Sequence, residues 1–293
     1  MTSKTLAWCR WLIILACLDL SVARGDDLSL CTARADGNYY AAGEVIRSRI
    51  SADRLRLELI ETAGSVDNLK RLARGECDAA IVQIDAYLEY QEANRAKRLE
   101  LTHPNYLYEE FVHLVCRRDA GITDIEDLSK ADGQKAVLIG EPDSGSAATW
   151  RYFTVLDSSY AAIPTRAVGG TQALAEIQGS DSAACMFFVA GLRSAFSAAV
   201  NDAGDKLRIV PVDDPDLDKA HFAGERIYRF REIPAGTYPR LESDDKRDIE
   251  TLTVGATLFV TRSWAAAHNH ANAYLVDAIQ RAKPAILQRV APP

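Results

Sequence analysis

Four loops bring small, polar and charged residues to the points where predicted strands end and helices begin. Residues 33–40 hold one cation and two tyrosines, residues 62–65 and 83–85 supply hydroxyl and amide groups, and residues 141–146 read Glu-Pro-Asp-Ser-Gly-Ser. The free N–H groups and the dipole of a helix N-terminus attract anions, and Arg34 adds a guanidinium suited to a carboxylate. Each loop alone is also what ordinary helix capping requires. Because such loops occur in both halves of the chain, together they predict a site for a small anion.

Hydrophobic periodicity predicts alternating strands and helices around the first three loops. The strands are 28–32, 55–60 and 78–83, and the helices are 42–50, 65–74 and a polar segment containing residues 87–90. Gly75 follows the second helix as a C-terminal cap. Strand and helix alternating at this spacing predict a mainly parallel sheet with helices on both faces.

A second block repeats this alternation. Its strands are 111–116, 135–140, 165–168 and 183–189, its helices are 145–156 and 171–178, and a strand at 251–261 with a helix at about 272–287 completes the chain. No Pro/Gly/Ser-rich linker separates the blocks, so we expect strands to connect them. The predicted fold class is α/β, with two α/β domains joined by crossing hinge strands and a ligand cleft between them. Domain 1 is 24–113 plus 250–293, and domain 2 is 114–249.

The chain has 293 residues, 34 Lys plus Arg, 41 Asp plus Glu and a formal net charge of −7. This composition is that of a globular protein and excludes a disordered or collagen-like chain. An acidic balance without a basic block excludes nucleic acid as the partner.

The N-terminus has the pattern of a secretory signal peptide over residues 1–23. Lys4 and Arg10 precede a short apolar run, and Ser21-Val22-Ala23 supplies small residues for cleavage after Ala23. We therefore expect a periplasmic protein, whose net charge becomes −8 because the lost segment carries two cations and one Asp. A lipoprotein modified at Cys17 is the alternative, for which Leu15 and Asp19 make a poor match.

Four cysteines remain in the exported chain, at Cys31, Cys77, Cys116 and Cys185. Export permits disulfides, and four cysteines allow three pairings. Each lies in or beside an apolar run, where a buried free thiol that behaves as a small hydrophobe is the favoured interpretation. The pairing stays open.

Seven segments occur in an order that resembles one family. They are Gly37-Asn-Tyr-Tyr40, Ala63-Gly-Ser-Val-Asp-Asn-Leu69, Asp78-Ala-Ala-Ile-Val-Gln83, Val112-His-Leu-Val115, Pro142-Asp-Ser-Gly-Ser146, Phe187-Phe-Val-Ala-Gly-Leu192 and Ile233-Pro-Ala-Gly-Thr-Tyr238. From about residue 28 to 280 the chain resembles the TAXI family of solute-binding proteins, the extracytoplasmic receptors of TRAP transporters. The resemblance implies a type II periplasmic-binding-protein fold that holds a glutamate-like amino acid or another small carboxylate. It also implies the membrane subunits of a TRAP transporter as partners.

Carried over by motif, the resemblance implies a set of ligand-binding residues in the cleft. They are Gly37, Asn38, Tyr39, Gly64, Ser65, Gln83, Ser144, Gly145 and Ser146, with Ala190 and Gly191 at the cleft floor. Arg34 is added as a candidate carboxylate contact. The sequence departs from the family where its glycine-rich first loop reads Thr-Ala-Arg-Ala-Asp-Gly-Asn-Tyr-Tyr, and where Asp143 replaces a glycine.

Other functions fit less well. Pro142-Asp-Ser-Gly145 resembles a serine-protease string, but a triad is defined by geometry and this serine opens a helix. Asp214 to Glu225 has acidic residues at calcium-loop positions, with Lys219 where the turn requires glycine. His268 and His270, two residues apart, share no helix face. We expect a monomer with no cofactor, no metal and no enzymatic activity. A sensory protein that signals to a membrane partner without transport remains the alternative.

Overall fold

The computed structural model describes residues 25–130, 136–179, 183–222, 224–242 and 246–290. The predicted signal peptide and the alternative lipidation site at Cys17 lie outside the described residues. Within those ranges, no helix combines the length and the apolar character that crossing a bilayer requires.

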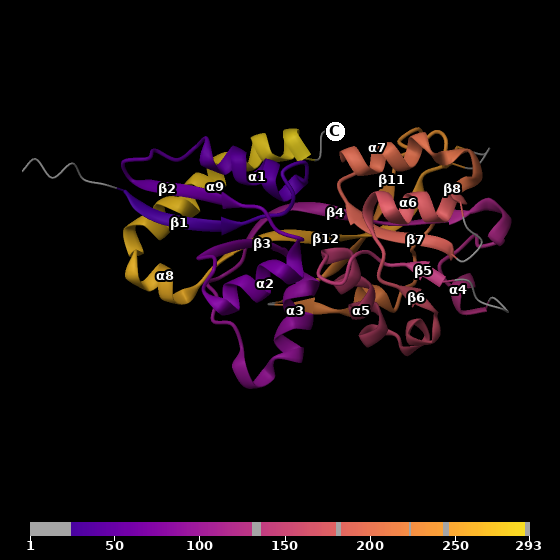
Figure 1. The fold of residues 1–293 in the computed structure, drawn as a ribbon, viewed down its shortest axis with the longest axis horizontal. Coiled ribbons are helices and arrows are strands. Elements are labelled where there is room, and N and C mark those ends of the chain that lie inside the picture. The colour runs from indigo at the N-terminus through magenta and orange to yellow at the C-terminus, as the bar shows by residue number, and fades with distance from the viewer. Residues whose placement is uncertain (1–24, 131–135, 180–182, 223, 243–245, 291–293) are drawn as a thin grey trace, which may run out of the picture.

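The first lobe, which we define as residues 25–104 and 261–290, is a sheet covered on both faces by helices (Figure 1). Its strands are β1 (Asp26–Cys31), β2 (Leu55–Ile60) and β3 (Ala79–Gln83), and its helices are α1 (Asn38–Arg47), α2 (Ser65–Arg74), α3 (Ile84–Ala93), α8 (Arg262–Ala267) and α9 (Asn269–Val290). Helices α1 and α9 lie on one face of the sheet and α2 and α3 on the other.

The second lobe, the described residues of 118–248, has the same three layers. Its strands are β5 (Ala136–Leu138), β6 (Thr165–Arg166), β7 (Ala183–Ala190), β8 (Leu207–Val210), β9 (His221–Phe222), β10 (Glu225–Arg226) and β11 (Tyr228–Ile233), and its helices are α4 (Asp127–Lys130), α5 (Gly145–Leu156), α6 (Gly170–Gly179) and α7 (Ala195–Asp202). Short 3-10 turns occur at Arg95–Lys97, Arg118–Ala120, Ser158–Ala162, Gly204–Lys206 and Leu217–Lys219.

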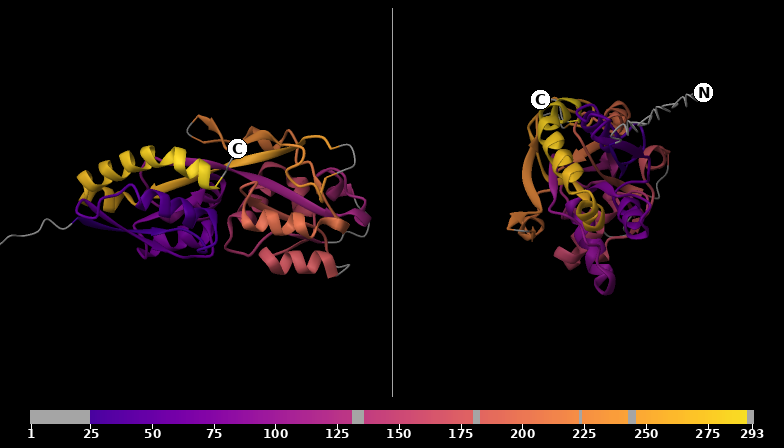
Figure 2. Two further views of the ribbon diagram at one scale, coloured as in Figure 1. Left: turned by 90° about the horizontal axis from the view of Figure 1, so that it is seen from above. Right: turned by 90° about the vertical axis from the view of Figure 1, so that its left-hand side faces the viewer.

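Two long strands, β4 (Asn105–Arg117) and β12 (Ile249–Val260), run between the lobes and join them in one sheet of order β2-β1-β3-β12-β4-β7-β5-β6 (Figures 1 and 2). Strands β1 to β3, and β5 with its neighbours β6 and β7, pair in parallel, whereas β12 and β4 pair antiparallel with every partner. The sheet is therefore mixed and not mainly parallel. The predicted domain boundaries fall inside β4 and β12 and stay a prediction.

Several predicted bounds were wrong. Helix α1 begins at Asn38 and not at residue 42, because Gly37 ends the loop in an extended conformation and the polar first turn conceals the helical period. Strands β8 and β11 and helices α7 and α8 were not predicted, since each is short or carries charges on its exposed face.

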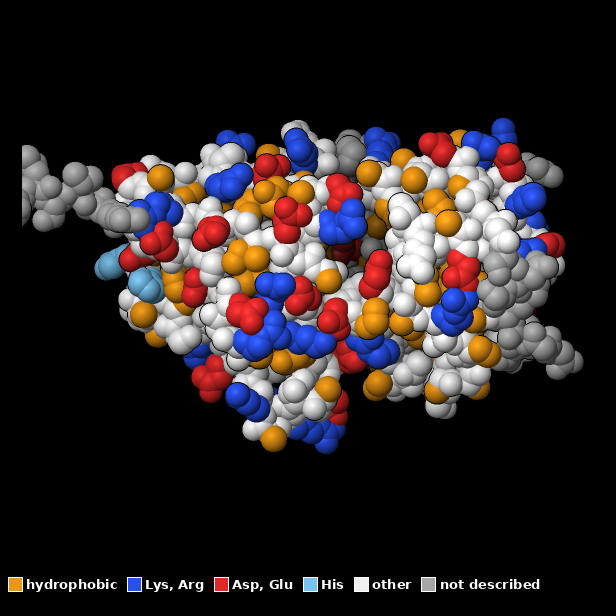
Figure 3. Space-filling view, in the orientation of Figure 1, with side chains coloured by type: hydrophobic (Ala, Val, Ile, Leu, Met, Phe, Trp, Pro, Cys, Tyr) orange, Lys and Arg blue, Asp and Glu red, His pale blue; other side chains and the backbone are white. Residues whose placement is uncertain are grey.

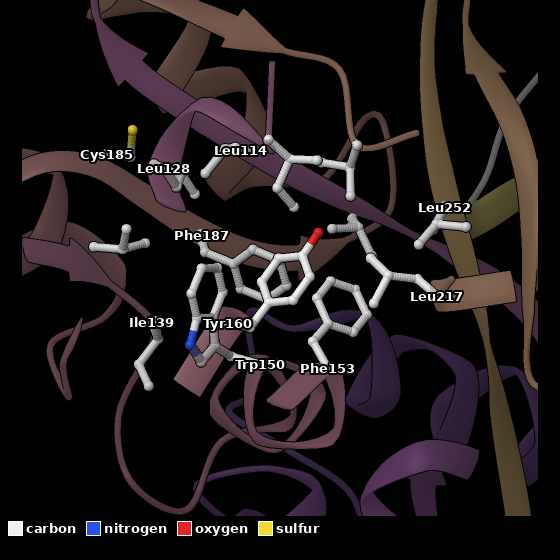
Figure 4. Close-up of a cluster of buried hydrophobic side chains, with 14 of the residues drawn as sticks. Leu114, Leu128, Ile139, Trp150, Phe153, Tyr160, Cys185, Phe187, Leu217 and Leu252 are labelled. Atoms are coloured by element: carbon white, nitrogen blue, oxygen red, sulfur yellow. The ribbon is translucent and has the colours of Figure 1, made fainter. Parts of the chain in front are cut away.

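Separate apolar clusters fill the two lobes. In the second lobe, Trp150 and Phe153 of α5 meet Phe187 of β7 edge to face, with ring centroids 5.1 and 5.7 Å apart (Figure 4). In the first lobe, Leu30, Ile46 and Leu275 are fully buried between the sheet and the α1–α9 pair. Burying these side chains contributes about 1.5–3 kcal/mol each, which lets each lobe hold its own loops in place.

Both pairs of the remaining cysteines form disulfides, so the free-thiol interpretation was wrong. Cys31 bonds to Cys77, and Cys116 bonds to Cys185. All four cysteines are buried, as free thiols would be. However, the pairing of β4 with β7 sets Cys116 opposite Cys185, with Cα atoms 4.0 Å apart, and Cys77, just before β3, lies 5.9 Å from Cys31 of β1. Wide sequence spacing concealed that proximity.

Reduction of these disulfides is expected to destabilise each lobe by about 2–5 kcal/mol per bond, because the two closed loops are long. Urea unfolding of the chain with Cys116→Ser and Cys185→Ser, compared with the parent, measures the loss for the second lobe. Alkylation of the unfolded, unreduced parent at any of these four cysteines would contradict the pairing.

Candidate functional site

A cavity of about 510 Å³ lies between the lobes, and Figure 3 shows a hollow there. Eleven of the twelve predicted ligand-binding residues line it, from Arg34 and Gly37 in the first lobe to Ser146 and Ala190 in the second. Gly191 is not in the lining. It packs beside the cavity so closely against Asn38 and the Val290 carbonyl that it has no room for a Cβ.

Two helix N-termini from opposite lobes open into the cavity with free N–H groups. At α1, Gly37 supplies no capping side chain. At α5, the Ser144 hydroxyl accepts only the Ala147 N–H, at 3.2 Å. The N–H groups of Asn38, Tyr39, Gly145 and Ser146 have no acceptor among the described residues. The cavity thus presents unpaired donors and two positive helix ends to whatever it holds.

Gln83 adds an unpaired side-chain donor between these helices. Its side chain is 2% exposed and lies against Gly145, where a Cβ would overlap Gln83 Oε1. Its Nε2 has no partner among the described residues. A buried donor without an acceptor costs about 1–3 kcal/mol, so this amide favours a ligand oxygen in the cavity.

The floor of the cavity holds a chain of hydrogen bonds that ends on a buried carboxyl group. The Gln83 N–H donates to Ser65 Oγ at 3.1 Å, Ser65 Oγ lies 3.2 Å from the Tyr39 hydroxyl, and Tyr39 donates to Glu110 Oε2 at 2.9 Å. Since the Tyr39 proton points to Glu110, the Ser65 hydroxyl donates to Tyr39. Burial raises the pKa of Glu110 to about 8.

The remaining charges of the cavity are matched within the protein. Arg34 pairs with Asp36 at 3.2 Å, and both side chains are largely exposed at 82% and 69%. Glu141 lies against Gly169 and Gly170 at the N-terminus of α6, where a carboxylate is stabilised. Arg34 is therefore neutralised by its neighbour and is not a free cation.

Contacts between the lobes close the cavity beside α2 and α3. The Asp143 carbonyl accepts the N–H groups of Val66 and Asp67 at 3.2 and 3.3 Å, which uses the N-terminus of α2. Arg151 forms a two-pronged ion pair with Glu89 at 2.6 and 3.0 Å. The structure therefore has the lobes in contact, in a closed arrangement.

A buried carboxyl group strengthens this contact from within. Thr149 of α5 and Tyr228 of β11 donate to Asp85 Oδ2 at 2.6 and 2.7 Å, which joins the start of α3 to the second lobe. Burial raises the pKa of Asp85.

The family model for the NMT1-like family matches residues 30–271, most of the chain. The chain belongs to the NMT1-like family.

Three solved structures share the fold of this NMT1-like chain. The GluR0 ligand-binding core from Nostoc punctiforme, in complex with L-glutamate, is 14% identical with a TM-score of 0.52 over 91% of this chain and 100% of that one. Lactococcal OpuAC with glycine betaine is 11% identical with a TM-score of 0.52 over 90% and 89%. SsuA from Xanthomonas axonopodis pv. citri, bound to MOPS, is 14% identical with a TM-score of 0.53 over 91% and 76%. The fold is that of type II periplasmic binding proteins.

Sequence reasoning missed several cavity residues of this NMT1-like chain. Gly169 to Gln172 follow β6 and open α6, so the strand-to-helix rule used for the other loops would have found them. Glu110 had a different signal. It shares the buried face of β4 with Tyr108 and Val112 at a period of two, and a carboxylate there is exceptional.

Glu110→Gln is expected to change how stability depends on pH in this NMT1-like protein. Because the pKa of Glu110 rises from 4.5 to about 8 on folding, the folded parent binds more protons, and its stability falls as pH increases through that range. Between pH 6.5 and 8 the free energy of unfolding of the parent should fall by about 2 kcal/mol, a loss that the variant should not show. Urea unfolding at each pH measures this free energy for the parent and the variant.

The exposed Glu58→Gln, on β2, is the control and should follow the parent. His113, whose pKa burial lowers to about 4, is neutral in the folded state across this window. Its unfolded form titrates in the same way in the parent and in both variants, so it adds nothing to the difference between them. Equal slopes for Glu110→Gln and the parent would show that Glu110 is ionised throughout.

Proposed function

We propose that this protein is an extracytoplasmic solute receptor that binds a small carboxylate or amino acid between its lobes. The supporting observation is the meeting of α1 and α5, whose free N–H groups face one cavity from opposite lobes beside the unpaired Gln83 amide. A carboxylate, with about four acceptor sites on its two oxygens, matches most of these donors at once. The proposed ligand site comprises the predicted residues that line the cavity, from Arg34 to Ala190.

Closure is the step that makes such a protein a receptor. A ligand that touches both α1 and α5 binds the closed form best, so it shifts the open–closed equilibrium toward closure. The closed surface then serves as the signal that membrane subunits recognise. We propose, from the resemblance of its motifs to the TAXI family, that these are subunits of a TRAP transporter.

Two further features support export and the ligand class. The two disulfides suit an oxidising compartment. Solved proteins of the same fold were crystallised with L-glutamate, glycine betaine and MOPS, each of which carries an anionic group.

A thermal-shift screen of amino acids, dicarboxylates and 2-oxo acids tests the proposal on the chain lacking residues 1–23, refolded to remove carried-over solute. At a hundred times its Kd, a true ligand adds about 2.7 kcal/mol of stability and raises Tm by about 5–10 °C. A screen in which no small acid raises Tm would contradict the proposal.

Gln83→Met locates the site. Loss of the buried amide donor should weaken binding of the hit by about tenfold or more in calorimetry, because the ligand oxygen loses its partner. Gln288→Met, on the exposed face of α9, is the matched control and should leave affinity unchanged. Full affinity in Gln83→Met would place the ligand elsewhere.

A further inference from the structure

Among the described residues, three carboxyl groups line the cavity, and two of them have a positive partner. Asp36 pairs with Arg34, and Glu141 lies at the N-terminus of α6. Glu110 differs from both. It is 5% exposed and forms no ion pair with any described residue.

The hydrogen bonds around Glu110 leave one oxygen unused. Tyr39 donates to Oε2 at 2.9 Å, and no described residue donates to Oε1. Because the chain from the Gln83 N–H through Ser65 and Tyr39 runs in one direction, every proton in it points toward Glu110. The network is arranged to stabilise a carboxylate.

A carboxylate buried without a counter-charge is costly, and a cation that enters the cavity removes that cost. The helix ends of α1 and α5, with Gln83, receive the anionic end of a ligand. Gln83 and Glu110 line the same cavity, so a molecule that fills it contacts both. The complementary ligand therefore carries a negative and a positive group close together.

We propose that Glu110 binds an ammonium group of the ligand, and that the receptor thereby selects a free amino acid over a 2-oxo acid or dicarboxylate of the same size. This inference rests on the proposed receptor function. Glu110 is the specificity-determining residue, and Tyr39 positions it.

Proton exchange on binding follows from the surroundings of Glu110. Tyr39 of α1, Tyr108 of β4 and Asp85 at the start of α3 are the titratable groups that act on it. With a pKa of about 8, Glu110 is mostly protonated in the empty protein at pH 7. An arriving ammonium group favours the carboxylate form of Glu110, so binding should release about one proton.

Calorimetry on matched pairs tests the inference: L-glutamate with 2-oxoglutarate, L-leucine with 4-methyl-2-oxopentanoate, and L-alanine with pyruvate. The parent should bind at least one amino acid about tenfold or more tightly than its 2-oxo partner. Glu110→Gln keeps an acceptor for Tyr39 and should weaken the amino acid about tenfold while leaving the 2-oxo acid within about threefold. The control Glu141→Gln, in the same cavity, should retain the preference.

The outcomes separate the two proposals. Equal or tighter binding of the 2-oxo acids, or unchanged amino-acid affinity in Glu110→Gln, overturns the role of Glu110 while the receptor function stands. Binding of no probe contradicts both. Should Glu110→Gln fail to fold, the parent protein alone provides the test. Calorimetric titration of the parent with the amino acid at pH 7, in buffers of different ionisation enthalpy, should show proton release. Absence of proton release would mean that Glu110 stays neutral when the ligand binds, and would overturn the inference.

Discussion

The antiparallel pairing of β4 with β12 is the constraint on which the rest of the structure depends. Each strand is long enough to leave one lobe and enter the other, so both lobes share one sheet and can move only by bending it. This pairing brings the strand ends of both lobes to a common edge. The N-termini of α1 and α5 meet there, and so does Glu110, which β4 itself carries. The cavity is thus a consequence of the crossing strands.

Local fields and not net charge determine what this cavity can hold. The chain is acidic overall, at −7, and its cavity contains three carboxyl groups against one arginine, which is already paired. A simple anion would gain from the helix ends of α1 and α5 but would meet Glu110 at the floor. A zwitterion satisfies both. The same low-dielectric surroundings that raise the pKa of Glu110 make its interaction with a cation strong.

Much of the fold was predictable because the buried strands carry continuous apolar runs and α2 and α5 begin at clear signals, Gly64-Ser65 and Ser144-Gly145. The antiparallel pairing could not be predicted, because sequence order does not show which strands become neighbours. For the same reason the Cys31–Cys77 and Cys116–Cys185 bonds could not be predicted. The loops of the site were found by one rule, strand end before helix start. That rule could not place Glu110, which lies within a strand, or show that Asp36 neutralises Arg34.

The central claim is that one small solute fills the cavity between the lobes and touches both. A crystal structure of the chain lacking residues 1–23, grown with the solute that gives the largest thermal shift, tests this most directly. The account predicts electron density for that solute between the N-termini of α1 and α5, with an oxygen within hydrogen-bond distance of Gln83 Nε2. Density for the solute on another surface, with the cavity holding only water, would contradict it.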